Sequence, residues 1–283
     1  MKQDFSRAAA TYDDAAVLAR ETGKRMAERL DYVKLSPVRM ADIGCASGDG
    51  IRALQQRYPA ALPLAIDFSC SMLQLVRQRM PLLQRLARRT PRLLNADARA
   101  LPLAANSLGL IWSNLMLHWL DDPLPALREM HRTLEVDGLL MFAMLGPDTL
   151  KELRRACVDS GVPMPPPLRK FHDMHDIGDM LVAAGFADPV MDMEMLTLTY
   201  AGPHGVRGLL RDQRHLGVRD ALLGHLPWRD WRRVFKAYAA HGKDGHLPAS
   251  FEVVYGHAWK PAPRMADDGR AIVRFEKKPG PAR

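Results

Sequence analysis

The sequence predicts an α/β protein in which helices cover both faces of a doubly wound, mostly parallel sheet. Three observations support this prediction. Short apolar stretches alternate with longer amphipathic ones up to about residue 145, glycines directly follow the first apolar stretch, and an aspartate lies at or near the end of each of the first three. Such alternation is typical of parallel sheets, whose strands are buried on both faces.

The elements can be assigned in chain order. Apolar and alanine positions recur at helical spacing from Phe5 to Leu30, before a turn at Leu35-Ser36-Pro37. The predicted strands and helices that follow are VRMADI (38–43), a helix over 50–58, LPLAID (62–67), a helix over 69–87, RLLNAD (92–97), LGLIWSN (108–114), a helix over 123–134 and LLMFAML (139–145).

The character of the chain changes after Gly146. VPMPPPL (162–168) has four prolines in seven residues and cannot be a helix or a central strand. The later segments are a helix over 175–186, a strand at MDMEMLTLTY (191–200), an Arg- and His-rich helical block over 203–243 and a strand at SFEVVYGHAW (250–259). We expect a domain over 37–260, in which residues 203–243 cover the ligand edge. A polar tail (261–283) follows, with a short strand at AIVRFE.

The composition is that of a globular protein, with 47% hydrophobic and 25% charged residues. There is no run of about 18 apolar residues, and the N-terminal segment lacks the pattern of a secretory or mitochondrial signal. We therefore expect a cytoplasmic location. Cys45, Cys70 and Cys157 have no metal-ligand spacing, which argues against disulfides and structural zinc.

Two interpretations compete for the loop after the first strand, at the edge where open parallel sheets bind ligands. GDGIRA (48–53) fits the dinucleotide pattern, in which a pyrophosphate rests on a helix N-terminus. In that pattern the first glycine closes the strand, whereas Gly48 comes four residues after Gly44. Asp42 would also repel a pyrophosphate, by roughly 4 kcal/mol at about 4 Å and an effective dielectric constant near 20. S-adenosylmethionine has no phosphate and carries an ammonium and a sulfonium group, so the sequence predicts this ligand.

Two further aspartates fit the same ligand. Asp67 closes the second strand, where its carboxylate can accept hydrogen bonds from both ribose hydroxyls. NAD would use the same feature, so Asp67 does not discriminate between the two ligands. Asp97 is placed to accept from the adenine amino group, with the backbone amide of Ala98 beside it. The alternative is that Asp97 caps the next turn.

Several segments carry a family resemblance. DIGCASG, LAIDFS, NADARALPL and LIWSNLMLHWL resemble the motifs of class I S-adenosylmethionine-dependent methyltransferases. FSRAAATYDDAAVLARETGKRMAERL, SNLMLHW, GPDTLKELR and LPASFEVVYGHAW are similar to the malonyl-[acyl-carrier protein] O-methyltransferases of biotin synthesis, over about residues 5–260. Mitochondrial complex I assembly factors are similar in SNLMLHW, in GPDTLKELR and in the C-terminal part. A non-catalytic assembly factor is therefore one alternative.

The resemblance implies a Rossmann-like sheet of seven strands with a helical insertion before the last strand. It also implies a helical lid (1–36) that places Tyr12 over the cofactor, whereas the alternative is that Tyr12 packs on the sheet. The cofactor contacts that it implies are Asp42, Gly44, Cys45, Ala46, Gly48, Asp67, Phe68, Met72, Asp97, Ala98 and Asn114.

Two positions depart from the family pattern. The loop usually reads GCGxG, and Ala46 replaces its second glycine, so we expect Ala46 to avoid positive φ. The fourth strand usually begins with Phe-Asp, and Leu108-Gly109 here removes a carboxylate that commonly braces the sheet. Either change is expected to weaken cofactor binding.

The resemblance implies methyl transfer to the free carboxylate of a malonyl thioester. A carboxylate with a pKa of about 4 is ionised at pH 7, so catalysis depends on placement and desolvation and needs no general base. A cation must hold that carboxylate, and Arg154 and Arg155 are the candidates, with solvated helix arginines as the alternative. His118 and Trp119 follow the fourth strand, where substrate is expected to meet the methyl group. The alternatives are a structural histidine and a hydrophobic wall.

The charge pattern predicts an anionic partner. Lysine and arginine exceed aspartate and glutamate by 40 to 32, a net charge of +8, with basic blocks at 77–89 and 228–233. We expect an acidic acyl-carrier protein that carries malonyl, steered by this charge, rather than nucleic acid or a membrane. An RNA- or protein-modifying enzyme on the same scaffold is the other alternative, but no recognised RNA-binding module flanks the core. Arginines at helical spacing are also common on solvated helix faces.

Overall fold

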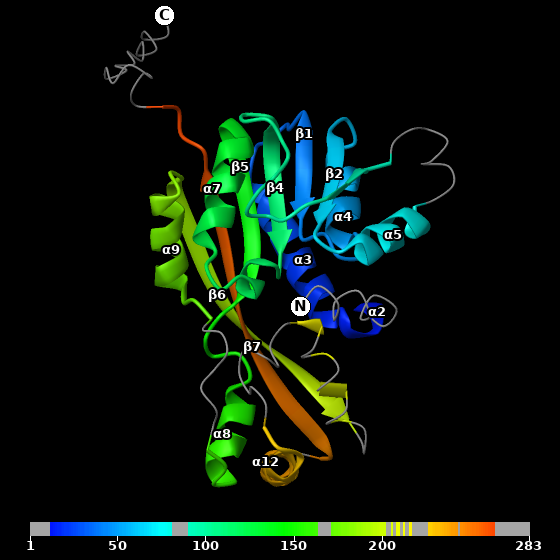
Figure 1. The fold of residues 1–283 in the computed structure, drawn as a ribbon, viewed down its shortest axis with the longest axis vertical. Helices are drawn as coiled ribbons and strands as arrows, with labels where there is room; N and C mark the ends of the chain where they lie inside the picture. Colours follow the sequence, from blue (N-terminus) through cyan, green and yellow to red (C-terminus); the bar gives the residue numbers. More distant parts are fainter. Residues whose placement is uncertain are drawn as a thin grey trace, which may run out of the picture.

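The described part of the chain contains one sheet of seven strands in the order β3-β2-β1-β4-β5-β7-β6 (Figure 1). The computed structural model describes residues 12–80, 90–163, 171–201, 226–242 and 244–263, with a few positions between 205 and 216. Strands β1 to β5 run parallel, and β7 is antiparallel to both of its neighbours. The predicted doubly wound α/β fold is confirmed.

Each predicted strand within the described residues is present. The strands are β1 (Arg39–Ile43), β2 (Leu62–Asp67), β3 (Arg92–Asn95), β4 (Leu108–Asn114), β5 (Leu134–Leu145), β6 (Ala187–Ala201) and β7 (His246–Trp259). β5 begins earlier than its apolar run because Leu134 pairs with Leu108 before a register shift. β3 ends before Asp97, which leaves this aspartate in the loop beyond the strand. The tail strand predicted at 271–276 lies outside the described residues.

The helices follow the predicted periodicity. They are α2 (Tyr12–Ala15), α3 (Val17–Arg29), α4 (Asp49–Arg57), α5 (Cys70–Arg79), α7 (Leu124–Thr133), α8 (Lys151–Asp159), α9 (Met174–Ala183) and α12 (Trp228–Ala240), with short 3-10 turns η2 (Leu30–Tyr32) and η3 (Leu117–Trp119). α5 begins at the N-cap Ser69, whose side chain accepts from Met72 N. The helix predicted over 69–87 is described only as far as α5, since residues 81–89 lie outside the described part. None of the described helices combines the length and the apolar composition needed to cross a membrane.

The two faces of the sheet have separate apolar cores. α3 and α4 cover one face, where Leu18, Met26 and Ile51 pack with Trp112 of β4. α7 and α9 cover the other face, and their buried residues include Leu127, Met130, Ile177 and Leu181. α3 therefore forms part of the core on this face of the sheet.

Strands β6 and β7 form a ribbon that extends beyond the rest of the sheet. β7 pairs with β5 only from Trp259 back to Val253, but its pairing with β6 continues to His246. α8 and α12 pack along the projecting part, as Figure 1 shows. Trp231 and Val234 of α12 share a core there with Phe251 of β7. Within the predicted 203–243 insertion, α12 is thus attached to the ribbon.

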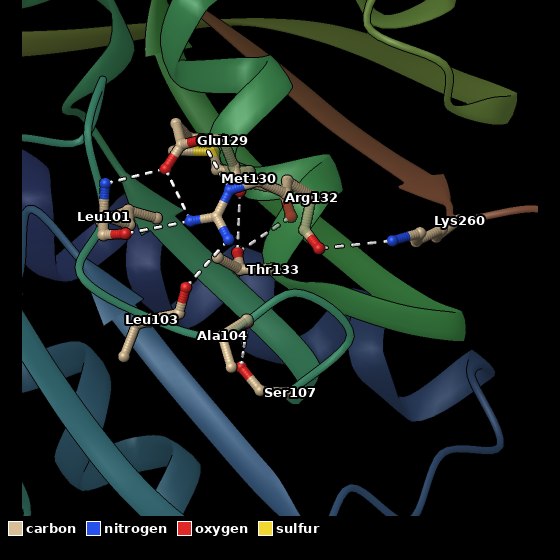
Figure 2. A network of polar contacts seen from close by, with 9 residues as sticks. All are labelled: Leu101, Leu103, Ala104, Ser107, Glu129, Met130, Arg132, Thr133 and Lys260. Carbon is tan, nitrogen blue, oxygen red and sulfur yellow. Dashed lines mark hydrogen bonds and ion pairs between the residues drawn. The ribbon is translucent and has the colours of Figure 1, made fainter.

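A polar network fixes the loop between β3 and β4 to the end of α7 (Figure 2). The guanidinium of Arg132 donates to the carbonyl oxygens of Leu101 and Leu103 at 3.0 and 2.9 Å and to the carboxylate of Glu129. Glu129 in turn accepts from Leu101 N at 2.9 Å. Lys260 Nζ adds a bond to the Leu134 carbonyl at 2.8 Å, and its burial lowers the pKa of this amine. The network positions the loop that begins at Asp97.

We expect Arg132→Met to lower the free energy of unfolding by about 1–2 kcal/mol, because two backbone carbonyls and Glu129 lose their donor. Arg128→Met is the matched control on the same helix, since its side chain is exposed, and it should change stability by less than about 0.5 kcal/mol. Urea denaturation of both variants measures the difference. Equal stabilities of the two variants would contradict the role given to Arg132.

Candidate active site

A cavity of about 420 Å³ opens at the carboxyl ends of the parallel strands. Its position agrees with the rule for open α/β sheets, because the chain order reverses between β1 and β4. The residues that line it are Tyr12 of α2, Ile43, Gly44 and Ala46 at the end of β1, 66–68 at the end of β2, 95–99 at the end of β3, 114–116 at the end of β4, Trp119 with Leu120, and His215 with Leu216.

The loop after β1 is held against the end of β2. The backbone N–H groups of Gly44 and Cys45 donate to the Ile66 carbonyl at 2.8 and 3.1 Å, and Gly48 N donates to the Cys45 carbonyl at 2.8 Å. Gly44 has a φ of 78°, and a Cβ there would lie 2.4 Å from the side chain of Met116. Glycine is therefore required where the loop passes Met116, just beyond the end of β4. Cys45 is buried, which raises the pKa of its thiol.

The expectation that Ala46 avoids positive φ was wrong. Ala46 has a φ of 43°, in the left-handed region that costs an L-residue about 1–2 kcal/mol. The strained residue is held by a hydrogen bond of 3.0 Å from its N–H to Asp67 Oδ2. The loop therefore keeps the glycine-like backbone with an alanine side chain in place.

The second departure, at Gly109, has a steric explanation. An added Cβ at this position would lie 2.7 Å from Oε1 of Glu135 and 3.1 Å from the Pro37 side chain. An aspartate would not fit without rearrangement, and the Glu135 carboxylate already lies at this end of β4. The loss of the family aspartate therefore does not leave the region without a carboxylate.

Asp67 joins three segments at the cavity. Its side chain is 4% exposed and accepts from Ala46 N and, at 2.8 Å, from Ser69 N. Burial raises the pKa of this carboxyl to about 6, although both hydrogen bonds act in the opposite direction. Each oxygen retains acceptor capacity toward the cavity, where ribose hydroxyls are expected.

A smaller recess of about 30 Å³ lies beside the main cavity and contains the buried carboxyl of Asp42. Burial, followed by the negative charges of Asp67 and Asp49, raises the pKa of Asp42 to about 8, and a hydrogen bond from the backbone of Ile51 opposes this shift. The indole N–H of Trp112 lines the same recess and lacks a hydrogen-bond partner within the described residues. A buried carboxyl beside an orphaned donor suits a group with both an ammonium and a carboxylate.

The loop after β3 reaches the cavity. Asp97 makes the turn-capping hydrogen bond that the alternative interpretation predicts for it. Asp97 Oδ1 accepts from Arg99 N at 2.9 Å, and its carboxylate also pairs with the Arg99 guanidinium. Asp97 therefore caps its own turn and at the same time lines the cavity with Ala98. Phe68 lines the cavity too, whereas Met72 is fully buried beneath it and is not among the lining residues.

Asn114 and Tyr12 connect the N-terminal helices to the site. Asn114 Nδ2 donates to the Ala19 carbonyl at 2.8 Å, and its Oδ1 accepts from Thr22 Oγ1 at 2.9 Å. Tyr12 lines both the cavity and the recess. Its burial and the nearby carboxylates of Asp67, Asp49 and Asp42 raise the pKa of the phenol, which therefore stays protonated.

His118 has hydrogen bonds at both ring nitrogens. Nδ1 accepts from Leu145 N at 3.4 Å, so Nε2 carries the proton and donates to the Leu216 carbonyl at 2.9 Å. The residue is 3% exposed and does not line the cavity, whereas its neighbour Trp119 does. This geometry fits the structural alternative for His118, which links β5 to the covering segment.

Arg154 and Arg155 lie apart from the cavity. Both belong to α8 beside the projecting ribbon, and neither is among the lining residues. Arg154 lies 3.6 Å from the Asp148 carboxylate, and Arg155 is exposed. The arrangement agrees with the alternative of solvated helix arginines.

His215 was not selected from the sequence. It is 5% exposed, lines the cavity, and makes an edge contact with the Tyr12 ring at 6.1 Å. The histidine lies in the basic block expected to cover the ligand edge, and Leu216 after it also lines the cavity. The packing of His215 against Tyr12 joins two distant segments, so the sequence alone gives no signal for it.

Comparison with known proteins identifies the family. A methyltransferase domain model matches residues 41–142. The chain is 50% identical to the malonyl-[acyl-carrier protein] O-methyltransferase of Gallionella capsiferriformans (strain ES-2), over 98% of this chain and 96% of the relative. It is 48% identical to the protein of the same name from Laribacter hongkongensis (strain HLHK9), over 97% and 94%. The chain belongs to the malonyl-[acyl-carrier protein] O-methyltransferase family.

The fold of this methyltransferase is shared with distant solved structures. The YcgJ protein from Bacillus subtilis superposes with a TM-score of 0.60 at 15% identity, over 86% of this chain and 99% of that one. The cofactor of the methyltransferase is S-adenosylmethionine, and the described residues fit it. Asp42 and Trp112 suit its amino-acid end, Asp67 its ribose, and the Phe68 and Asp97–Ala98 region its adenine.

Ala46→Gly should raise the free energy of unfolding by about 0.5–1 kcal/mol, because relief of the left-handed strain exceeds the entropy that glycine adds to the unfolded chain. Ala46→Val should lower it by about 2 kcal/mol, since a β-branched residue is least compatible with this φ. Urea denaturation of both variants measures the two effects. A stability loss in the glycine variant would show that Ala46 is not strained.

The raised pKa of Asp42 makes the stability of the ligand-free protein depend on pH. Folding favours the protonated carboxyl, so its stabilising contribution is complete below pH about 4 and is lost as the pH rises through about 8. Asp42→Asn cannot ionise and should lose less stability than the wild type between pH 5 and pH 9. The same variant should bind S-adenosylmethionine at least about tenfold more weakly at pH 8, because the ammonium loses its carboxylate.

Thermal unfolding without ligand and calorimetric titration with S-adenosylmethionine test the two effects separately. Parallel stability curves for the wild type and the variant across this pH range would refute the assigned pKa shift. Unchanged affinity would remove Asp42 from the cofactor site.

Proposed function

We propose that the protein transfers the methyl group of S-adenosylmethionine to the free carboxylate of a malonyl thioester held on an acyl-carrier protein, early in biotin synthesis. The observation that carries this proposal is the 50% identity to a malonyl-[acyl-carrier protein] O-methyltransferase over nearly the whole of both chains. The cavity supports it, because its acidic edge suits a cationic, phosphate-free adenosyl ligand.

Three carboxyl side chains would hold the cofactor. Asp42 would face its ammonium, Asp67 its ribose hydroxyls, and Asp97 the adenine amino group beside Ala98. The indole N–H of Trp112 would gain an acceptor when a carboxylate enters the recess, which removes the cost of a buried, unpaired donor. When bound, S-adenosylmethionine supplies a methyl group on a positively charged sulfur.

The substrate would enter beside Tyr12, Trp119 and His215. The Tyr12 phenol remains protonated and can therefore donate a hydrogen bond to a substrate carboxylate or carbonyl. Because Arg154 and Arg155 do not line the cavity, we assign the substrate carboxylate to the region of Tyr12 and His215. Trp119, Leu115 and Met116 provide apolar walls that exclude water from the reacting carboxylate.

This arrangement suits a nucleophile that needs no deprotonation. A malonyl carboxylate is ionised at neutral pH, and the chain must only orient it and reduce its hydration. The two hydrogen bonds of His118 are consistent with this mechanism, because the ring is committed to backbone groups of Leu145 and Leu216. The residue therefore positions the covering segment, and we assign it no proton transfer.

The test is methyl transfer from labelled S-adenosylmethionine to purified malonyl-acyl-carrier protein, with the product identified by mass spectrometry as the malonyl methyl ester. Tyr12→Phe should raise KM for the malonyl substrate by about tenfold, since one hydrogen bond to an ionised group is lost. Tyr32→Phe is the matched control, because Tyr32 is 91% exposed, and it should leave the kinetics unchanged. Label found in RNA or in a protein side chain instead of the malonyl group would support the alternative enzyme class. Absence of S-adenosylmethionine binding would favour an assembly factor.

A further inference from the structure

Helix α12 has one basic face and one buried face. Trp231, Val234 and Tyr238 are buried against the ribbon and α8. The cations Arg229, Arg232, Arg233 and Lys236 are exposed at positions i, i+3, i+4 and i+7. This spacing places them along one side of the helix. We call this set of four residues the α12 stripe.

The charge of the α12 stripe is not balanced by the helix itself. Asp230 is the only acidic residue of α12, and it lies 4.0 Å from Arg233. Arg233 also donates to the Ser160 carbonyl at 2.8 Å, which anchors it to the end of α8. An ordinary solvated helix face mixes both signs of charge, so this excess of cations indicates an acidic partner.

An exposed tryptophan begins the same helix. Trp228 is 70% exposed and stands one helical turn before Arg232. Tryptophan and arginine are the residues most enriched among those that dominate protein interfaces. Because burial of the ring would recover apolar surface, Trp228 and the stripe together resemble a protein-binding surface more than a surface selected only for solubility.

The surface is structurally connected to the cavity. Tyr238 of α12 donates from its hydroxyl to the Pro248 carbonyl of β7. On the paired strand, Tyr200 of β6 donates to the buried Asp212 at 2.9 Å, within the segment that goes on to His215 and Leu216 at the cavity. Figure 1 shows α12 beyond the carboxyl ends of the parallel strands. A protein docked on α12 would therefore lie on the side of the molecule where the cavity opens.

We propose that the α12 stripe and Trp228 form the docking surface for an acidic helix on the acyl-carrier protein. This inference depends on the proposed function for the identity of the partner. The four cations extend over a rise of seven residues along α12, a length of about 10 Å at the rise of an α-helix. This length matches about two turns of a helix on the partner. A membrane fits less well, because the apolar face of α12 is already buried in the protein.

The experiment compares a carrier-bound substrate with a small one. Arg229→Glu/Arg232→Glu should lower kcat/KM for malonyl-acyl-carrier protein by at least about tenfold and change kcat/KM for malonyl-coenzyme A by less than about twofold. Lys34→Glu/Arg128→Glu changes the charge by the same amount at exposed positions elsewhere in the chain, and should leave both values near the wild type. Trp228→Ala should selectively weaken use of the carrier without any change of charge.

Several results would overturn the proposal. If the charge-reversed variant lost kcat/KM equally with both thioesters, the substitutions would act on the active site. If it lost no kcat/KM with the carrier-bound substrate, the carrier would dock on another surface. Direct binding of the carrier protein, measured by fluorescence anisotropy, makes the test independent of catalysis: the charge-reversed variant should bind at least about tenfold more weakly, and equal binding would refute the surface. If the charge-reversed variant bound the carrier normally but lost binding to double-stranded RNA or to anionic vesicles, the α12 surface would be assigned to that partner instead. If the wild type methylates neither thioester but binds the carrier through α12, the proposed function fails and the docking surface stands.

Discussion

The hydrogen bond from the N–H of Ala46 to the carboxylate of Asp67 joins the ends of the two strands that frame the cavity. It holds Ala46 in a left-handed conformation that alanine alone would avoid, and it fixes the Asp67 side chain where a ribose would lie. The second oxygen of Asp67 accepts from Ser69 N, so the same carboxylate also positions the start of α5. Rotation of this one side chain would release the loop, the helix start and the ligand contact together.

Burial of two carboxyl groups in the site costs free energy, and a bound cationic ligand can offset that cost. Asp42 and Asp67 are both buried, and each carboxyl has a raised pKa because water is excluded from it. Burial and, after it, the same charges raise the pKa of the Tyr12 phenol, which stays protonated beside the opening. A cation in the recess would reverse these shifts, so the free energy lost by burying the carboxyls contributes to ligand selectivity. Stability without ligand is thus lower than it would be with neutral residues at these positions.

Much of the fold could be predicted from the sequence because its signals are local. The period of the apolar residues predicts the strands and helices, and Asp42, Asp67 and Gly44 predict the ligand edge. The features that the sequence alone does not reveal depend on contacts between distant segments. The positive φ of Ala46 requires Asp67 as its partner, and the burial of His118 requires carbonyl and amide groups 98 and 27 residues away. Arg154 follows β5 closely in the sequence, but α8 packs beside the ribbon and Arg154 is not among the residues that line the cavity.

The long β6–β7 ribbon separates the cofactor cavity from the docking surface proposed on α12. The parallel strands end at the cavity and supply the residues that fit the cofactor, whereas the antiparallel ribbon continues past Leu145 and carries α8 and α12. A substrate carried on another protein needs such a division, because the carrier must be bound at a distance from the reacting carboxylate. The packing of Tyr238 and Trp231 and the hydrogen bond of Tyr238 attach α12 to the ribbon. Charge on its outer face can therefore change without altering the carboxylates, the glycine loop or the walls of the cavity.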